Sequence, residues 1–210
     1  TAPLVTRWPV EPWPLPEKYF SANLVGSRAV EYLQELGTEQ PFYLQATFCS
    51  PHPPYDAPAS YLEATPYEEV DDFVTPADQP LTEEEKKALW HNRHHYRAMI
   101  ACVDDWIGRM MDVLEQRNLL DDTLIIFTSD HGEMLGDHRL YNKQRPYKES
   151  TRIPLIIRWP GQTESRRHNG MVELTDLTNT MLEAAGLDPQ EALDTRGLSF
   201  HGRLPGRSLR

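Results

Sequence analysis

The stretch that decides the fold runs from Asp122 to Gly161 and reads DTLIIFTSDHGEMLGDHRLYNKQRPYKESTRIPLIIRWPG. It opens with a short apolar run at 123–128 and ends with a second one at 153–159. Both runs are too short for helices and rich in β-forming residues, which is typical of strands buried on both faces of a parallel sheet. Ser129, Asp130 and His131 follow the first run. Because ligands bind beyond the carboxyl ends of strands in open α/β sheets, the sequence predicts a functional site here.

The remaining sequence alternates predicted helices with predicted strands. Strands that alternate with helices indicate βαβ units, so the expected fold class is α/β, with a mostly parallel (mixed) sheet sandwiched by helices. The first half of the chain is expected to contain a helix capped by Ser21 that runs to Leu36, a strand at 42–48, and a helix from a capping box at 82–85 to about Asn118. The two strands described above follow, and then a short strand near 171–174 and a helix at 175–185.

Composition limits the classes of protein to which the chain can belong. Its 210 residues, 39% of them hydrophobic and 10% aromatic, suffice for one sizeable domain. The formal net charge of −11 excludes a nucleic-acid partner, which would require a basic surface. No apolar run reaches 18 residues, so no membrane span is expected. Cys49 and Cys102 form neither a disulfide framework nor a zinc pattern.

Two segments lack helical or strand periodicity. Residues 1–20 are rich in proline and are predicted to be an irregular N-terminal segment, distinct from residues 21–210. Residues 56–81 are acidic and are predicted to be one long loop. The sequence starts at Thr1 without an initiator Met or the apolar core of a signal peptide, so we expect it to begin inside a longer protein. The expected protein is soluble, and its compartment stays open between the cytoplasm and, after loss of a leader, the periplasm or exterior.

Asp130 and His131 are candidate metal ligands. Consecutive strand residues point to opposite faces, but at the turn that leaves a strand both side chains can approach one ion. A carboxylate favours a hard cation such as Ca²⁺, whereas an imidazole tolerates softer metals. The alternative is that Asp130 only stabilises the turn at Gly132.

Three further side chains are candidates for contact with an anionic substrate or for proton transfer. Lys143 offers a point charge for sulfate or phosphate oxygens, or else it is a solvated surface charge. His138 is either a proton donor near neutral pH or an ordinary loop residue. His52 lies between prolines that fix its backbone, which suits a substrate contact or an acid/base group, although a loop histidine can also be incidental.

Three histidines at helical spacing, His91, His94 and His95, are the remaining metal-capable group. They lack the glutamate of a His-Glu-x-x-His zinc motif. We therefore expect them to be ordinary residues of the long helix.

Several motifs together resemble one known family. The segment Thr128-Ser-Asp-His-Gly-Glu-Met-Leu-Gly-Asp-His138, followed by Lys143-x-x-x-Tyr147-x-Glu-Ser-x-Arg-Ile-Pro154, resembles the downstream signature of type I sulfatases, which belong to the alkaline phosphatase superfamily. The resemblance is to the arylsulfatase, iduronate-2-sulfatase and choline-sulfatase group, and the Asp-His pair is similar to that of iduronate-2-sulfatase-, choline-sulfatase- and phosphonate-hydrolase-like members. Ser50-Pro-His-Pro-Pro-Tyr55 resembles the family's Pro-His-x-Pro loop, and 172–186 followed by 205–209 resembles the segment that closes the large domain.

The resemblance implies a role for each candidate residue. Asp130 and His131 would be ligands of a divalent metal, with Ca²⁺ favoured over Mn²⁺ or Mg²⁺. Lys143 would bind the sulfate group, and His52 would contact the sulfate or its leaving oxygen. His138 has no fixed role in the family and is kept as a candidate substrate contact. The implied fold is alkaline-phosphatase-like but incomplete, with residues 21–210 forming the central and C-terminal part of the catalytic domain.

One family element is missing from the sequence. The nucleophile of type I sulfatases is a formylglycine made from the first residue of Cys/Ser-x-Pro-x-Arg, which lies upstream beside a pair of metal-binding aspartates. Cys49-Ser-Pro-His-Pro53 carries a proline where that motif has arginine, and its prolines oppose the helix that should follow the nucleophile. We therefore expect a half-site: metal ligands and sulfate-binding side chains without the nucleophile.

The expected function is metal-dependent hydrolysis of sulfate esters by a larger protein, with a sulfated small molecule or sulfated sugar as substrate. The isolated chain is expected to be inactive. Two alternatives remain, namely a phosphonate monoester or phosphodiester hydrolase of the same superfamily, and a non-catalytic protein that binds sulfate or sugar. The sequence alone does not indicate the oligomeric state.

Overall fold

A computed structural model of the chain describes residues 9–37, 39–162, 164–194, 206 and 208–209. The chain divides into two compact units. Unit 1 comprises Thr1–Asp122 and His131–Ile153, and unit 2 comprises Thr123–Asp130 and Pro154–Arg210. The second boundary between them therefore falls between Asp130 and His131, the two candidate metal ligands.

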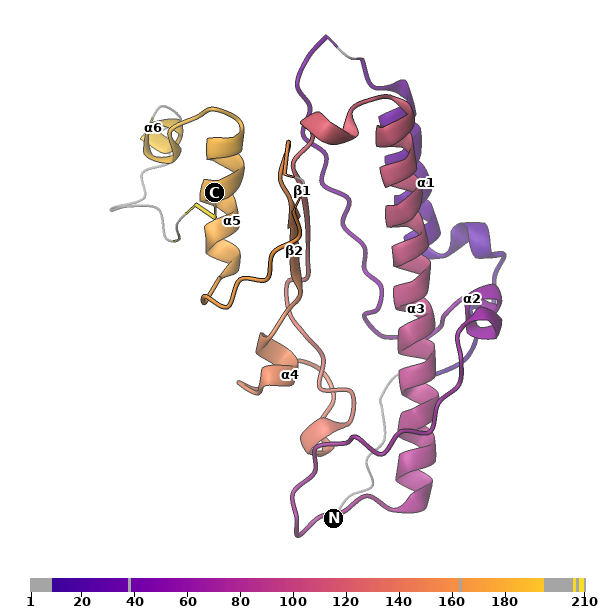
Figure 1. Cartoon of the computed structure of the whole chain (residues 1–210). Coiled ribbons are helices and arrows are strands. Elements are labelled where there is room, and N and C mark those ends of the chain that lie inside the picture. The colour runs from indigo at the N-terminus through magenta and orange to yellow at the C-terminus, as the bar shows by residue number, and fades with distance from the viewer. Residues whose placement is uncertain (1–8, 38, 163, 195–205, 207, 210) are drawn as a thin grey trace. The chain divides into compact units, whose positions relative to one another are not determined.

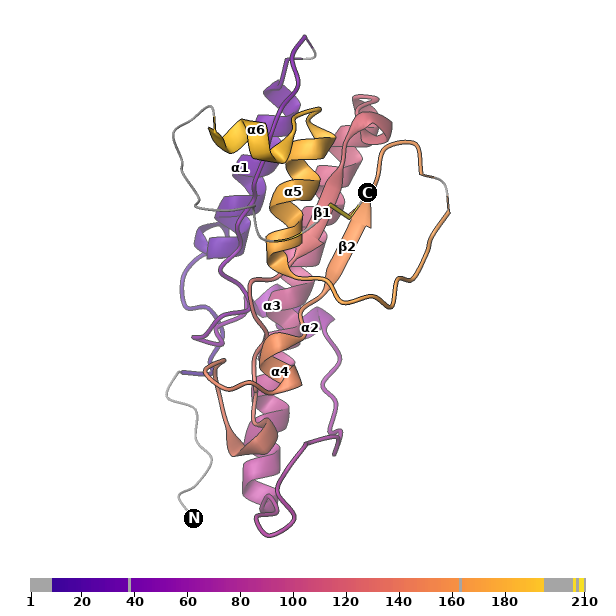
Figure 2. The same ribbon diagram turned by 90° about the vertical axis from the view of Figure 1, so that its left-hand side faces the viewer.

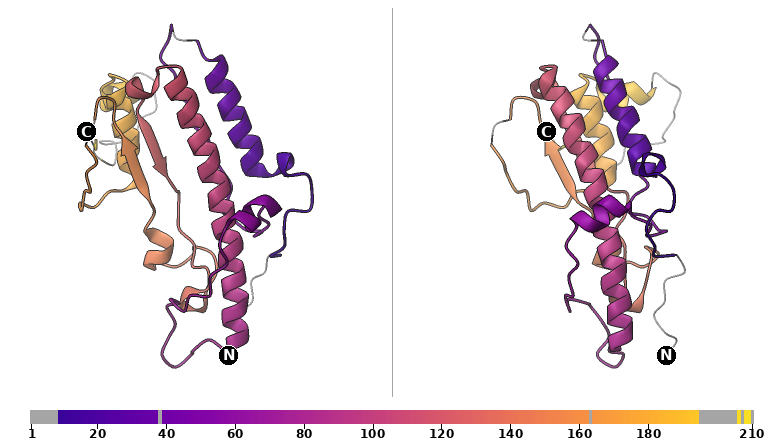
Figure 3. Two further views of the ribbon diagram at one scale, coloured as in Figure 1. Left: turned by 45° about the vertical axis from the view of Figure 1, so that its right-hand side comes forward. Right: turned by 90° about the vertical axis from the view of Figure 1, so that its right-hand side faces the viewer.

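Unit 1 is built on two helices that lie side by side, α1 (Ser21–Glu35) and α3 (Glu83–Gln116) (Figures 1 and 3). Its other helical elements are short: η1 (Glu17–Tyr19), α2 (Ala59–Ala64), η2 (Leu120–Asp122), η3 (Asp137–Arg139) and α4 (Lys148–Thr151).

The start of α3 is fixed by the capping box that the sequence predicts. Thr82 Oγ1 accepts a hydrogen bond from the Glu85 backbone N–H at 3.2 Å, and Glu85 Oε2 accepts from the Thr82 N–H at 2.9 Å. Two otherwise unpaired backbone donors are satisfied in this way. The helix α1 begins at Ser21 as expected, but its cap is Phe20 rather than Ser21, and no side chain caps it.

The contact between α1 and α3 is close because one helix offers a glycine where the other offers an indole. A Cβ atom on Gly26 would lie 2.2 Å from two atoms of the Trp106 ring. The Trp106 Nε1–H donates to Asn23 Oδ1 on α1 at 2.6 Å, so the indole is held by packing and by a hydrogen bond. Beyond this contact, the Arg117 guanidinium donates at 2.5 Å to the Leu33 and Leu36 carbonyls at the end of α1.

The N-terminal segment is docked onto the core of unit 1. The Trp13 N–H donates to Ala57 O at 3.0 Å, and the Tyr55 N–H donates to Pro9 O at 3.2 Å. Its described part contains the three-residue η1. The predicted loop at 56–81 is interrupted by α2, whose six residues pack on α3.

Unit 2 contains a two-stranded sheet and two helices. The strands are β1 (Ile125–Thr128) and β2 (Leu155–Arg158), and the helices are α5 (Leu174–Ala184) and α6 (Pro189–Asp194) (Figure 2). The positions of both strands and of α5 agree with the sequence, and Gly186 follows α5 with a positive φ of 74°.

The pairing of these strands differs from the prediction. They are antiparallel, with Ile126 opposite Ile157. A parallel pair requires a crossover that returns the chain along the strand, usually a helix of a dozen or more residues. The segment between β1 and β2 contains only η3 and α4, of three and four residues, and it does not make such a crossover. The expected mostly parallel sheet is therefore not seen in the described strands.

Two other predicted strands are absent from the described chain. Residues 171–173 have no strand pairing, and residue 174 already belongs to α5. Residues 42–48 alternate between half-buried and exposed positions, which is the period of a strand, but they have no pairing partner among the described residues. The prediction of a strand at 42–48 is therefore wrong for the described chain, although the burial pattern keeps the period of a strand.

No described helix is both long enough and apolar enough to cross a membrane. The longest helix, α3, has the length but carries charged residues throughout.

The glycine contact predicts opposite effects of the same substitution at two helical positions. Gly26→Ala should lower the free energy of unfolding by about 1–3 kcal/mol, because the new methyl group overlaps the Trp106 ring. Gly108→Ala, on α3 with nothing within 4 Å of its added Cβ, should raise it by up to about 1 kcal/mol. Urea unfolding of both variants measures the difference. Equal effects would show that the interface is not packed as described.

Candidate active site

Asp130 and His131 lie immediately beyond the end of β1, which stops at Thr128. Asp130 is exposed and His131 is half-buried. The Nδ1 atom of His131 lies 2.8 Å from Gly132 O. Because a carbonyl oxygen only accepts, Nδ1 carries the proton and Nε2 keeps its lone pair, which is the form that a metal ligand needs. The donor set therefore fits a divalent metal.

Lys143 lies in a loop whose backbone is fixed on both sides. Ser150 Oγ donates to Lys143 O at 2.5 Å. The Asn142 N–H donates to Glu133 Oε1 at 2.5 Å, and Asn142 O accepts from the Met134 N–H at 3.0 Å. Lys143 itself is half-buried. These hydrogen bonds restrict the loop backbone and thereby fix the backbone position of Lys143.

Tyr141 ties this loop to α3. Its hydroxyl accepts a hydrogen bond from Asn92 Nδ2 at 2.6 Å. Burial raises the pKa of Tyr141 to about 12, so it remains a neutral hydroxyl at physiological pH. The hydrogen bond between Asn92 and Tyr141 is therefore insensitive to pH across the physiological range.

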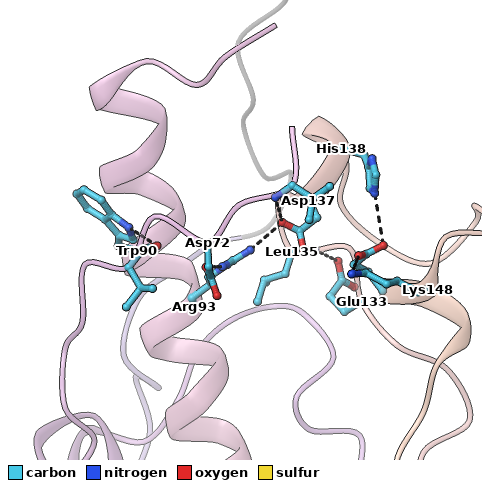
Figure 4. A network of polar contacts seen from close by, with 11 residues as sticks. Asp72, Trp90, Arg93, Glu133, Leu135, Asp137, His138 and Lys148 are labelled. Atoms are coloured by element: carbon cyan, nitrogen blue, oxygen red, sulfur yellow. Dashed lines mark hydrogen bonds and ion pairs between the residues drawn. The ribbon is translucent and has the colours of Figure 1, made fainter. Parts of the chain in front are cut away.

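His138 faces a carboxylate across the loop (Figure 4). Its Nε2 atom lies 3.5 Å from Glu149 Oε2, and its ring stacks on Tyr147 with centroids 3.9 Å apart and planes 10° from parallel. Its backbone has a φ of 54°, and its N–H donates to Val74 O at 2.6 Å. His138 thus contacts the loop that carries Lys143, and this contact does not test its predicted role in substrate binding.

The acidic segment 66–74 bridges α3 and the start of this loop. Arg93 on α3 pairs with Asp72 of the segment and, at 3.0 Å, with Asp137 (Figure 4). Asp137 also accepts from the Val74 N–H at 3.0 Å. The Arg93–Asp137 pair is partly shielded from solvent, since its side chains are 20% and 15% exposed, whereas Asp72 is 64% exposed. The acidic charge is consequently matched by basic residues of α3.

His52 lies in the proline-rich loop that follows the extended segment 42–48, and its side chain is exposed. Its Nδ1 lies 2.8 Å from Pro53 O, so Nδ1 carries the proton and Nε2 is available. The residue borders a pocket of about 380 Å³ that is also lined by Trp13 and Tyr19. A ligand can therefore reach the imidazole.

The loops of His52 and Lys143 are anchored to the same core. Tyr55, three residues after His52, is buried in the main apolar cluster of unit 1, and Tyr141, two residues before Lys143, packs against that cluster. Unit 1 therefore places both loops, and with them His131 and His138, on one framework. Asp130 belongs to unit 2.

A protein-family model described as Sulfatase matches residues 4–187 of the chain. The chain belongs to the sulfatase family. Its match covers every candidate residue named above.

Two relatives show how much of a sulfatase-type protein the chain represents. An arylsulfatase of Clostridium perfringens is 28% identical over 219 residues, which cover 96% of this chain and 45% of the relative. The multifunctional alkaline phosphatase superfamily protein PehA of Trinickia caryophylli is 32% identical over 222 residues, which cover 90% of the chain and 42% of that protein. The chain spans less than half the length of these curated relatives.

Solved structures confirm the fold class. The phosphonate monoester hydrolase of Agrobacterium radiobacter superposes with a TM-score of 0.75 at 24% identity, over 99% of this chain and 45% of that one. A structure of BT4656 in complex with D-glucosamine-2-N,6-O-disulfate superposes with a TM-score of 0.66 at 20% identity, over 90% of this chain and 51% of that one. The sulfatase chain is thus an incomplete, alkaline-phosphatase-like α/β fold.

Sequence reasoning missed two residues that hold the candidate site of this sulfatase together. A Cβ atom on Gly132 would lie 2.0 Å from Glu149 O, so only glycine fits there. The carboxylate oxygens of Glu149 are buried, although charged side chains are rarely buried. Both residues stand in the motifs quoted above, but nothing in their local sequence indicates that they meet.

The three histidines of α3 are not a metal cluster in the described part of the chain, where no group of three metal-capable side chains occurs. The His94 Nε2 atom lies within 3.2 Å of two backbone carbonyls. His95 is 2% exposed, and its ring contacts that of His91 with centroids 4.6 Å apart. Burial, followed by the neighbouring His91 and His94, lowers the pKa of His95 from its ordinary value near 6.5 to about 4.

This pKa predicts a loss of stability in mild acid. In the unfolded chain His95 binds a proton below about pH 6.5, whereas in the folded protein it does so only below about pH 4. The free energy of unfolding should therefore fall by up to about 3 kcal/mol as the pH is lowered through this window. His95→Gln should flatten the dependence, measured by urea unfolding between pH 7 and pH 4.5. His168→Gln, at an exposed position, is the control and should leave it unchanged. A slope that survives in His95→Gln would contradict the assignment.

Proposed function

We propose that the natural protein that carries these residues hydrolyses sulfate esters, and that this chain contributes the metal-binding and sulfate-binding side of the active site. The match to the sulfatase family over residues 4–187 carries the proposal. The arrangement of the candidate residues supports it, since an Asp-His pair directly follows a strand and a lysine is held in a fixed loop shortly downstream.

Asp130 and His131 are the proposed ligands of a divalent metal, with Ca²⁺ first and Mn²⁺ or Mg²⁺ as alternatives. The contact of His131 Nδ1 with Gly132 O supports this role because a metal-ligating histidine is usually oriented by a backbone carbonyl at its other ring nitrogen. Two protein ligands are fewer than the six to eight oxygens that Ca²⁺ usually takes, so substrate, water or other residues must supply the rest. A metal bound here would stabilise negative charge on the sulfate oxygens.

Lys143 and His52 are the proposed contacts to the sulfate group. The Lys143 ammonium is a compact positive charge on a long stem, which suits an anion with several equivalent oxygens. The Nε2 atom of His52 can accept a hydrogen bond and, once protonated, can donate one to the leaving oxygen. Neither residue replaces the nucleophile, and the sequence contains no Cys/Ser-x-Pro-x-Arg motif. These 210 residues by themselves are therefore expected not to turn over substrate.

The proposed substrate is a sulfated small molecule or a sulfated sugar. The complex of the related structure with a disulfated glucosamine supports a sugar. An acidic chain would repel a polyanionic glycan. Part of that charge is neutralised in unit 1, where Arg93 pairs with Asp72 and Asp137, and Lys86 pairs with Asp71 at 2.9 Å.

The natural protein should hydrolyse an aryl sulfate with a higher kcat/KM than an aryl phosphodiester. Lys143→Ala should lower kcat/KM for the sulfate about 10²- to 10³-fold, because one charge that stabilises the transition state is lost. Lys148→Ala removes a charge that is 72% exposed and should change it less than about twofold. A preference for the diester would favour a phosphonate or phosphodiester hydrolase. Binding of sulfate without turnover of either ester would favour the non-catalytic alternative.

Removal of divalent metal should lower the melting temperature of the natural protein, and added Ca²⁺ should restore it, because a ligand that binds only the folded state stabilises it. Asp130→Asn should remove most of this metal-dependent shift, since it replaces a charged ligand by a neutral amide. Asp78→Asn, the same change at an exposed turn, should keep the full shift. Thermal unfolding with chelator and with Ca²⁺, together with calorimetric titration, provides the comparison. An unchanged shift in Asp130→Asn would contradict the assignment.

A further inference from the structure

We infer that Glu149 and His138 form a pair that positions Lys143, so that both act on catalysis through the lysine rather than by touching substrate. The inference rests on the proposed function, in which Lys143 binds the sulfate group. Neither the sequence motifs nor the comparisons assign a role to Glu149, and the sequence suggested only a substrate contact or a proton donor for His138.

The carboxylate of Glu149 is unusual in its surroundings. Both oxygens are shielded from solvent and lack a hydrogen-bond partner among the described residues. The nearest nitrogen atoms of basic side chains are His138 Nε2 at 3.5 Å and Lys148 Nζ at 3.6 Å. Lys148 is 72% exposed, whereas His138 is 23% exposed. Because solvent screens the lysine, the imidazole is the partner that shares the shielded surroundings of the carboxylate.

The imidazole of His138 is held toward Glu149 at a conformational cost. His138 has a φ of 54°, and the non-glycine neighbours Leu135, Arg139 and Asn142 have φ values between 42° and 68°. Such left-handed residues are uncommon and persist only where surrounding contacts enforce them. Here the contacts are the stack on Tyr147 and the bond from the His138 N–H to Val74 O. A concentration of strained residues is typical of functional sites.

The pair closes the loop that contains Lys143. His138 stands five residues before the lysine, and Glu149 stands six residues after it. Glu149 is followed directly by Ser150, whose hydroxyl holds the Lys143 carbonyl at 2.5 Å. A shift of Glu149 would therefore move the residue that fixes the lysine backbone.

The same segment is joined to the residue after the candidate metal ligands. The Gly132 N–H donates to Ser150 O at 2.8 Å, and the Glu149 carbonyl packs on the Gly132 Cα. The backbone of Glu149 and Ser150 thus contacts the turn at Gly132 as well as the loop of Lys143. A shift of Glu149 would be felt at both.

The test is a double-mutant cycle in the natural protein with an aryl sulfate as substrate. Glu149→Gln keeps the volume and removes the charge, and it should lower kcat/KM about 100-fold, as expected when a catalytic group is misplaced by about 1 Å. In a Lys143→Ala background the same substitution should lower kcat/KM less than about threefold, because the residue through which it acts is gone. Full additivity of the two effects would overturn the inference.

Two controls separate positioning from general destabilisation. Glu31→Gln makes the same chemical change in an exposed ion pair with Arg28 and should leave kcat/KM within about twofold. Lys148→Ala removes the other basic side chain beside Glu149 and should also leave kcat/KM within about twofold. If Lys148→Ala lowered kcat/KM as much as Glu149→Gln does, the partner of Glu149 would be Lys148 and not His138. A fall in melting temperature for Glu149→Gln without a fall in kcat would assign it a merely structural role.

Substitution of His138 provides a second test of its pairing with Glu149. His138→Gln leaves a buried carboxylate without its partner, so it should destabilise the protein more than Glu149→Gln does. The double variant His138→Gln/Glu149→Gln, in which two amides face each other, should recover part of that stability. If Glu149→Gln does not accumulate as folded protein, the double variant replaces it in the cycle with Lys143→Ala. Independent effects of the two substitutions on melting temperature would contradict the pairing.

Failure of the proposed function gives a different result from failure of this inference. If the protein prefers a phosphodiester, the proposed sulfatase activity is wrong, but the same cycle on that ester still tests whether Glu149 acts through Lys143. If the sulfate ester is hydrolysed and the effects add, the function stands and the inference fails.

Discussion

The close approach of Gly132 to the backbone at Glu149 and Ser150 is the constraint on which the candidate site depends. Only a residue without a side chain allows this approach, since a Cβ would lie 2.0 Å from Glu149 O. The bond from the Gly132 N–H to Ser150 O then fixes the end of the loop, and Ser150 Oγ fixes the carbonyl of Lys143. Through Ser150, a single glycine thereby links the turn after the candidate metal ligands to Lys143.

Ion pairs within unit 1 account for much of the charge of its acidic segment. The acidic segment 66–74 does not stand free in solvent, because Arg93, Lys86 and Arg97 of α3 pair with its carboxylates. Arg93 also pairs with Asp137, so the same guanidinium joins the segment to the start of the Lys143 loop. In unit 1 the negative charge is used to tie elements together, and the net charge of −11 is therefore a poor guide to the charge around Lys143.

The family assignment and the geometry carry different parts of the conclusion. The match over residues 4–187 establishes a sulfatase chain, and the solved relatives establish its alkaline-phosphatase-like fold. Neither says how the side chains of this chain are held. The fixed Nδ1–H of His131 and His52, each bonded to the next residue's carbonyl, and the buried pair of Glu149 with His138 come from the structure alone. These contacts show how the side chains of the motif residues are oriented.

The sequence by itself determined what depends on neighbouring residues. The capping box at Thr82 and Glu85, the apolar runs of β1 and β2, and the Asp130-His131 pair that follows β1 are local signals, and each was found where the sequence predicted it. Only the tertiary structure decided the antiparallel pairing of β1 with β2, the lack of a partner for residues 42–48 among the described residues, and the burial of Glu149. Strand pairing and burial depend on residues distant in sequence, and an isolated apolar run or a lone glutamate carries no information about which distant residue it will meet.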